Sequence, residues 1–399
     1  MTDLHQFRRI VWPLAVAETI VWAAIYYSFP ALLPAWESDL GWSKTELTGA
    51  FTSALVVSAL FAPVAGRLID HGYGRHTFAG GAVLGAVMLL LLSQVTEIWQ
   101  FYAMWIGLGF AMSSALYESC FSVLTHSMGP DAKRAITLVT LVAGFAGTIS
   151  FPSAHFLTDL VGWRGTVLVF AAAVMTLAVP LIWNSCRLAE RQAETHALAA
   201  SKNAAQALIV VRSATFWLLA LAFAVLAFNH GMVITHILPM LDDRGLQLET
   251  AVLAASMIGP MQVTGRLAIM AAERYVSTRF IALGCYVALG ISACSLLGAT
   301  AAPGLIVGFV IFQGAGMGVF SIMRPVVTAE LLGRRNFGVV SGLTAVVYVG
   351  GAAVAPMAAA LLWKTGGYDL VILVALAAAV IGLLALTAAW RSASPNDSG

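Results

Sequence analysis

The chain has 399 residues, of which 60% are hydrophobic and 10% are charged, and its formal net charge is +2. Soluble globular domains carry about 25% charged residues, so these charges are too few to cover a soluble surface, and the sequence indicates an integral membrane protein. The small net charge excludes a large basic surface, and we expect no nucleic acid as a partner.

Twelve apolar stretches are long enough to cross a bilayer, for which a helix needs about 20 mostly apolar residues. The stretches are continuous and rich in alanine and leucine, which excludes the alternating pattern of a transmembrane β-barrel. We therefore predict an all-α membrane protein of twelve transmembrane helices. The predicted spans are residues 10–33, 48–69, 78–95, 99–122, 136–160, 165–187, 213–238, 251–271, 279–299, 303–327, 338–362 and 369–390.

The first predicted span contains Glu18, followed at i+4 and i+8 by Trp22 and Tyr26. Residues at this spacing share one face of a helix. An ionisable side chain inside a membrane costs about 2.5–3.5 kcal/mol on insertion scales and is therefore a functional candidate. We interpret the three residues as a wet, substrate-binding wall, with Glu18 also available for proton coupling. The alternative is a glutamate that extends to the membrane interface beside two packing aromatics.

The connection between the second and third spans contains Gly66, Asp70, Gly74 and Arg75. Glycines permit a tight turn, and an aspartate offers a carboxylate to a helix N-terminus or to an arginine. These residues therefore predict a tight connection whose carboxylate binds a neighbouring helix end or an arginine. The alternative is a bare turn between two helices.

The fourth predicted span contains Glu118, about one turn from its end. A carboxyl group in a partly dry cavity can exchange a proton, and we interpret Glu118 as a second residue for proton coupling. A structural role as the partner of a basic group such as Arg67 or Arg134 is the alternative.

The longest polar gap, about residues 188–212, follows the sixth span and is rich in Ala, Glu, Gln and Lys. It predicts a helical cytoplasmic linker. The linker divides the chain into an N-terminal six-helix bundle, residues 1–187, and a C-terminal six-helix bundle, residues 213–399.

Polar residues recur inside the spans of the second half. Asn229 and His230 lie near the middle of the seventh span, Gln262 and Arg266 lie one turn apart in the eighth, and Gln313 lies mid-way along the tenth. A neutral histidine can hydrogen-bond a substrate, and the planar guanidinium of an arginine matches a carboxylate. We predict that all five contact the substrate. The alternatives are a histidine bonded to a neighbouring helix and an arginine that marks a helix end.

The two halves show signs of an internal repeat. Pro152 in the fifth span matches Pro356 in the eleventh, 204 residues later, and Gly162 and Gly366 follow at the same offset. Similar offsets at several positions predict two parallel six-helix repeats.

Lysine and arginine are distributed unevenly between the predicted loops. If the N-terminus lies in the cytoplasm, 17 of the 21 fall on the cytoplasmic side. Cytoplasmic loops carry such an excess, so we predict a multi-pass protein of the cytoplasmic (inner) membrane with both termini in the cytoplasm. The four cations predicted outside are Lys44, Arg164, Arg244 and Lys364.

The whole pattern resembles a major facilitator superfamily transporter. The connection from Gly66 to Arg75 is similar to the superfamily's loop signature, a glycine, an aspartate four residues later, and then a glycine with a basic pair. Here one extra residue separates Asp70 from Gly74, and His76 replaces the second basic residue. The resemblance implies that Gly66, Asp70, Gly74 and Arg75 form a gating loop that latches the two halves on the cytoplasmic side.

Two stretches are similar to monocarboxylate porters and the related bacterial oxalate/formate antiporters. They are Phe29-Pro30 with Glu37, Asp39 and Gly41-Trp42, and Ile258-Gly259-Pro260-Met261-Gln262-Val263-Thr264-Gly265-Arg266. In the porters, an arginine at the position of Arg266 binds the substrate carboxylate. Two positions depart from the porter pattern, Ala31 where a lysine is frequent and Gln262 where an aspartate is frequent.

These features predict a secondary active transporter of a small organic solute, and the resemblance implies an organic anion moved with protons by alternating access. The alternative cargo is a larger aromatic nutrient, such as a flavin-like vitamin, or a drug or metabolite for efflux. The sequence shows no nucleophile with a base, no metal-ligand cluster and no nucleotide-binding loop, so we expect no enzyme, no cofactor and no metal. We expect a monomer in the lipid bilayer, with a small-molecule substrate and the proton as its partners.

Overall fold

The computed structural model of the protein describes residues 4–128, 131–193, 212–272, 274–333 and 337–393. The regular secondary structure of these residues is helical, without a strand, which confirms the predicted all-α class. The chain divides into two compact units, residues 1–199 and 200–399. The predicted linker, 188–212, crosses this division, and because residues 194–211 lie outside the described residues, its boundaries stay a prediction.

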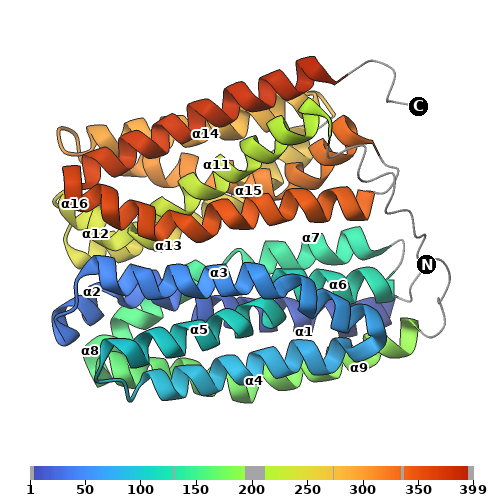
Figure 1. Ribbon diagram of the computed structural model, residues 1–399, viewed down its shortest axis with the longest axis horizontal. Coiled ribbons are helices and arrows are strands. Elements are labelled where there is room, and N and C mark those ends of the chain that lie inside the picture. The colour runs from blue at the N-terminus through green and yellow to red at the C-terminus, as the bar shows by residue number, and fades with distance from the viewer. Residues whose placement is uncertain (1–3, 129–130, 194–211, 273, 334–336, 394–399) are drawn as a thin grey trace. The chain divides into compact units, whose positions relative to one another are not determined.

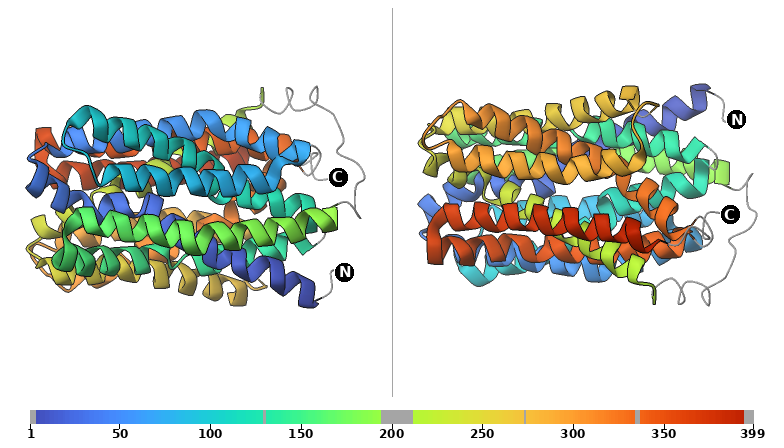
Figure 2. Two further views of the ribbon diagram at one scale, coloured as in Figure 1. Left: turned by 90° about the horizontal axis from the view of Figure 1, so that it is seen from below. Right: turned by 90° about the horizontal axis from the view of Figure 1, so that it is seen from above.

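Long helices of the first unit run side by side along a common direction (Figure 1, Figure 2). Three short π-helical segments, labelled η, interrupt them. In chain order the unit comprises α1 (Leu4–Val21), η1 (Trp22–Tyr26), α2 (Ser28–Leu40), α3 (Lys44–Leu68), η2 (Ile69–Tyr73), α4 (Gly74–Leu92), α5 (Ile98–Ala115), α6 (Tyr117–Met128), α7 (Ala132–Ala143), α8 (Ala146–Ala173), η4 (Val174–Ala178) and α9 (Val179–Ala193).

The described helices of the second unit contain no π-helical segment. It comprises α11 (Ala214–Thr235), α12 (Ile237–Asp243), α13 (Leu248–Ala272), α14 (Thr278–Gly298), α15 (Leu305–Leu332) and α16 (Phe337–Ser392). Figure 1 shows α16, in orange and red, turning back on itself. The turn is at Gly366 and Gly367, where the backbone leaves the helical conformation. Gly162 breaks α8 in the same way.

Nine helical stretches among the described residues are long and apolar enough to cross a membrane. Large apolar side chains remain exposed along them, for example Leu60, Phe156 and Leu384, as expected of surfaces that face lipid. The two longest of the nine stretches, Arg134–Arg191 and Gly342–Ser392, contain a glycine break, at Gly162 and at Gly366-Gly367. The multi-pass membrane class is confirmed, and the count of twelve spans stays a prediction.

The first span is interrupted by a π-helical turn. The Tyr27 amide donates to the Trp22 carbonyl, five residues back, at 2.9 Å. The helix resumes at Ser28 and continues to Leu40, where Gly41 with φ 68° ends it. A single π-helical turn inside an α-helix is frequent at functional sites, and this one carries the two aromatic residues predicted to contact substrate.

Glycines allow close helix contact at two positions in particular. A Cβ atom on Gly109 of α5 would collide with the Ala54 carbonyl oxygen of α3, and one on Gly318 of α15 would collide with the Gln262 carbonyl oxygen of α13. Small residues at such crossings let two backbones approach in a membrane, where packing and not hydrophobicity drives association. The second of these crossings also positions Gln262 and Arg266.

Candidate functional site

The carboxylate of Glu18 is fully buried inside the first unit, with an exposed fraction of 0%. The Cys120 thiol of α6 and the Trp22 indole are close enough to interact with it. However, neither carboxylate oxygen meets hydrogen-bond geometry with any described residue. A buried carboxylate without hydrogen bonds or a counter-charge is costly in a low-dielectric interior, and losing its charge by taking up a proton relieves that cost. Glu18 can therefore alternate between protonation states.

An aromatic cluster continues from Glu18 along η1. The ring centroids of Trp22 and Tyr26 are 5.0 Å apart, and Trp22 lies 4.7 Å from Tyr117 of α6. Tyr117 stacks on Phe121 at 5.1 Å, and Tyr26 meets Phe51 of α3 at 5.4 Å. The Trp22 indole nitrogen is buried without a hydrogen-bond partner among the described residues. The structure thus brings the predicted Glu18, Trp22 and Tyr26 together, and adds Tyr117 and Phe121.

Glu118 lies in the first turn of α6 and its side chain is exposed. It is next in sequence to Tyr117 of the aromatic cluster, but its own surroundings differ from those of Glu18. Of the two predicted proton-coupling residues, only Glu18 is enclosed by protein with no hydrogen-bond partner for its carboxylate among the described residues.

In the second unit, a chain of hydrogen bonds joins three helices. The Ser292 hydroxyl of α14 donates to Gln313 Oε1 of α15 at 2.9 Å, and Gln313 Nε2 lies 3.3 Å from His230 Nδ1 of α11. Because Oε1 accepts from Ser292, the amide nitrogen of Gln313 donates to Nδ1. A neutral histidine that accepts at Nδ1 carries its proton on Nε2, so this chain presents a half-buried N–H donor on His230.

Asn229, the residue before His230 in α11, is buried. Its Nδ2 donates to the Ala375 carbonyl of α16 at 2.7 Å. Its Oδ1 is buried and accepts no hydrogen bond from the described residues. Asn229 thus holds α11 to α16 with one atom and leaves an acceptor open with the other.

Arg266 and Gln262 are buried in the contact between α13 and α15. Arg266 is 4% exposed, and its Nε donates to the Gly318 carbonyl at 3.0 Å. Gln262 is 8% exposed. At least one donor of the guanidinium therefore holds the two helices together, and the predicted contact of Arg266 with a substrate carboxylate stays a prediction.

The predicted gating loop is tied to α9. The Arg75 amide donates to Glu190 Oε1 at 3.0 Å, the Arg75 Nε lies 3.7 Å from Glu190 Oε2, and the guanidinium lies 4.5 Å from the Trp183 ring centroid. Gly72 adopts φ 89°, which only glycine tolerates without strain. The Asp70 side chain lies outside the described residues, so its part in the loop stays a prediction.

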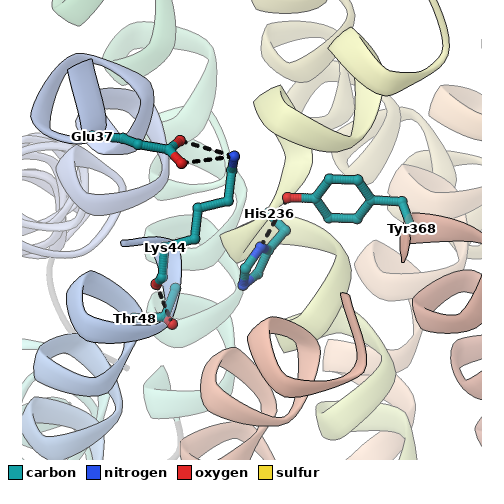
Figure 3. A network of polar contacts seen from close by, with 5 residues as sticks. All are labelled: Glu37, Lys44, Thr48, His236 and Tyr368. Atoms are coloured by element: carbon teal, nitrogen blue, oxygen red, sulfur yellow. Dashed lines mark hydrogen bonds and ion pairs between the residues drawn. The ribbon is translucent and has the colours of Figure 1, made fainter. Parts of the chain in front are cut away.

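Figure 3 draws polar contacts near helix ends in each of the two units. In the first unit, Lys44 pairs with Glu37 at 2.9 Å, and Thr48 donates to the Lys44 carbonyl. In the second unit, His236 Nδ1 lies 3.3 Å from the Tyr368 hydroxyl, and His236 Nε2 lies 3.2 Å from the Pro356 carbonyl. Both nitrogens of His236 are thus used inside its own unit.

No group of three or more potential metal ligands gathers among the described residues. The four cysteines are free, and Cys120, Cys186 and Cys285 are buried.

The sequence from residue 14 to residue 294 matches the model of the family described as Major Facilitator Superfamily. The match covers well over half of the chain. The chain belongs to the Major Facilitator Superfamily. Members of this superfamily carry small molecules across membranes, so the protein is a transporter and not an enzyme.

Solved structures of other superfamily members share the fold. The chain is similar to a bacterial homolog of the human lysosomal transporter Spinster in an inward-facing, occupied conformation, with a TM-score of 0.70, 13% identity, and coverage of 96% of each chain. It is also similar to the nucleoside transporter NupG, with a TM-score of 0.71, 14% identity, and coverage of 96% of this chain and 98% of the other. At such identities the likeness shows the superfamily fold alone.

One curated superfamily relative is the cephamycin export protein CmcT of Amycolatopsis lactamdurans, 28% identical over 159 residues. The similarity covers 39% of this chain and 32% of that protein, so the chain matches about a third of the relative's length.

Besides Tyr117 and Phe121, sequence patterns missed Ser292, Glu190 and Cys120 as members of these clusters. Ser292 and Glu190 are ordinary polar residues in their own helices, and only their partners, Gln313 and Arg75, were singled out. Cys120 lay in an apolar run. Their proximity to the predicted residues depends on how the helices are rotated against one another, for which no short sequence pattern exists.

Proposed function

We propose that this superfamily member is a secondary active transporter that moves a small organic solute across the cytoplasmic membrane by alternating access, coupled to protons through Glu18. The observation that carries the proposal is the buried Glu18 carboxylate without a described hydrogen-bond partner, beside the aromatic cluster. A proton on Glu18 removes a costly charge, so proton uptake and release at this residue can be linked to a change of conformation.

The aromatic cluster favours a cargo with a flat, apolar ring. Trp22, Tyr26 and Tyr117 are each half-buried. The ring centroid of Trp22 lies 5.0 Å from that of Tyr26 and 4.7 Å from that of Tyr117. Aromatic side chains stack on planar ligands and offer hydrogen-bonding tips. An aromatic nutrient and an aromatic metabolite for export both fit this chemistry. The partial similarity to a cephamycin export protein supports export of an aromatic metabolite.

A small organic anion is the second candidate cargo. It rests on Arg266, whose charge is permanent and which is buried next to Gln262. Its Nε donates to the Gly318 carbonyl, and the planar fork of a guanidinium matches the two oxygens of a carboxylate. The N–H donor of His230 adds a neutral hydrogen bond to either cargo.

The first test is ligand-induced thermal stabilisation of the protein purified in detergent. The panel contains small carboxylates, aromatic vitamins, a cephalosporin and hydrophobic cations, each tested on wild type, Trp22→Ala and Arg266→Gln. A ligand at 100 times its Kd adds about 2.7 kcal/mol if it binds only the folded state. Stabilisation lost in Trp22→Ala but kept in Arg266→Gln identifies an aromatic cargo, and the reverse pattern identifies an organic anion.

The second test uses proteoliposomes and the ligand found in the first. An imposed pH gradient should drive accumulation by wild type but not by Glu18→Gln, while exchange of labelled for unlabelled ligand should persist in the variant. Accumulation by wild type that ignores the pH gradient would contradict proton coupling. Loss of both activities in Glu18→Gln would assign Glu18 to binding instead.

We extend the proposal to the remaining predictions. Glu118, exposed beside Tyr117, is proposed to pass protons between water and Glu18. Gly66, Asp70, Gly74 and Arg75 are proposed to gate one face of the protein, with Arg75 held by Glu190. Both termini are proposed to lie in the cytoplasm, and the protein is proposed to act as a monomer.

A further inference from the structure

An arginine ties three helix ends together in the first unit. Arg164, two residues after the break at Gly162, donates from Nη1 to Asp39 Oδ2 at 2.8 Å and from Nη2 to the Val95 carbonyl at 3.1 Å. Asp39 is at the end of α2, and Val95 follows the end of α4. The Trp163 indole also donates to Asp39, at 2.6 Å. The first, third and sixth predicted spans therefore meet at one guanidinium.

The second unit contains the same arrangement. Arg244, directly after α12, donates from Nη1 to the Thr300 hydroxyl at 2.8 Å and from Nη2 to Asp369 Oδ1. Thr300 follows the end of α14, and Asp369 comes two residues after Gly367 in α16. Here the seventh, ninth and twelfth predicted spans meet.

The two arrangements occupy corresponding positions of the internal repeat. Arg244 lies 205 residues after Asp39, Thr300 lies 205 after Val95, and Asp369 lies 205 after Arg164. The acid and the base have exchanged places, because the first unit has its arginine on the sixth span and the second unit has its arginine on the seventh. The contact has thus been kept while the residues that form it have been inverted.

The side chains of the two ion pairs differ in how far they are exposed. The Arg244 side chain is 5% exposed and its partner Asp369 is 68% exposed, whereas Arg164 and Asp39 are 42% and 52% exposed. An exposed ion pair contributes little to stability, but a buried guanidinium that loses its partner is costly.

We propose that these contacts are a matched pair of clamps, each of which fastens the ends of three helices so that its half of the transporter moves as one body. The first clamp is Asp39, Val95 and Arg164, and the second is Arg244, Thr300 and Asp369. Each clamp depends on an arginine that reaches two other helix ends. Either of the two positions that form the ion pair can therefore carry the arginine, with the aspartate at the other. The inversion between the halves is a natural example of that exchange.

The second clamp offers a direct test, because the double variant Arg244→Asp/Asp369→Arg recreates the polarity of the first clamp. Each single reversal places two like charges together and should lower the unfolding temperature of the second unit by at least about 2–4 °C. The double variant should recover most of this loss, with the new arginine reaching Thr300.

Buried cysteines report unfolding separately in each unit. In a Cys294→Ser background, Cys285 reports on the second unit, and Cys120 and Cys186 report on the first, because these three thiols are buried in the folded protein. Reactivity toward a thiol reagent is measured at each cysteine by mass spectrometry during heating. If the double variant lowers the unfolding temperature by the sum of the two single decreases, the proposed clamp is wrong.

A double-mutant cycle with uncharged substitutions covers the case in which a charge-reversal variant does not fold. Arg244→Gln, Asp369→Asn and their combination should be non-additive if the two residues interact, and additivity would overturn the clamp. Hydrogen exchange on Arg244→Gln adds a second measurement. It should rise together at residues 298–302 and at residues 366–370, and stay unchanged at residues 93–97 of the first unit. A rise that misses residues 298–302 would show that Arg244 fastens no third helix end.

Discussion

At the scale of single residues, the two intramembrane glutamates have opposite surroundings. Glu18 is buried beside a thiol and an indole without a described hydrogen-bond partner, whereas Glu118 is exposed. Both lie within predicted spans, and both are predicted from sequence to couple protons. Burial separates them, because the free energy of a carboxylate depends on whether water or a counter-charge surrounds it.

We expect Glu18→Gln to leave the unfolding temperature of the purified protein unchanged or to raise it. The substitution keeps the shape of the side chain and removes a carboxyl group that has no described counter-charge. Thermal unfolding in detergent measures the effect, with Glu118→Gln as the matched exposed control. A clear decrease for Glu18→Gln would show that the carboxylate makes a stabilising contact.

We expect Gln313→Leu to destabilise the second unit by about 1–3 kcal/mol, because Nδ1 of the half-buried His230 loses its donor. Ser292 is affected less, since its hydroxyl also lies 3.3 Å from the Phe309 carbonyl. Chemical or thermal unfolding gives the measurement, and Ile311→Leu, on the exposed side of the same helix, is the control. Equal stability of the two variants would contradict the hydrogen-bonded chain.

At the scale of helices, close crossings and charged ends determine the architecture of each unit. Three of the four cations predicted to lie outside, Lys44, Arg164 and Arg244, form ion pairs at helix ends. Each is therefore balanced locally by an acid.

We expect Gly318→Ala to lower the unfolding temperature, because its new methyl group would collide with the backbone of α13 at Gln262. Separating the two helices would also lengthen the bond from Arg266 to the Gly318 carbonyl. Gly284→Ala in α14 is the matched control, since nothing lies within 4 Å of its Cβ position. The control should be neutral or stabilising, by up to about 1 kcal/mol, because alanine favours a helix over glycine. Equal behaviour of the two variants would contradict the close crossing.

At the scale of the whole molecule, the orientation in the membrane is testable by labelling. We expect an impermeant thiol reagent to label Lys364→Cys but not His71→Cys in intact cells, in a Cys294→Ser background. Both positions are exposed, so that reactivity depends on the side of the membrane. Permeabilised cells should label both variants, and the reverse pattern in intact cells would invert the predicted orientation.

The amino-acid sequence by itself determined the membrane class, the all-α fold, the superfamily and the presence of a repeat. Hydropathy and helical spacing are read from short stretches of sequence, and the offset between Pro152 and Pro356 is a simple count of residues. None of them needs three-dimensional information. They also placed Glu18, Trp22 and Tyr26 on one face of one helix, which the structure reproduces with Trp22 next to both other residues.

Only the tertiary structure decided which residues are partners. Glu190 pairs with Arg75 across 115 positions, Arg164 with Asp39 across 125, and Gln313 with His230 across 83. It also shifted one repeat match, because the glycine with positive φ that corresponds to Gly162 is Gly367, not Gly366. Such contacts depend on the rotation and depth of each helix against its neighbours. These are set by packing over the whole unit, and a local pattern of apolar and polar residues does not encode them.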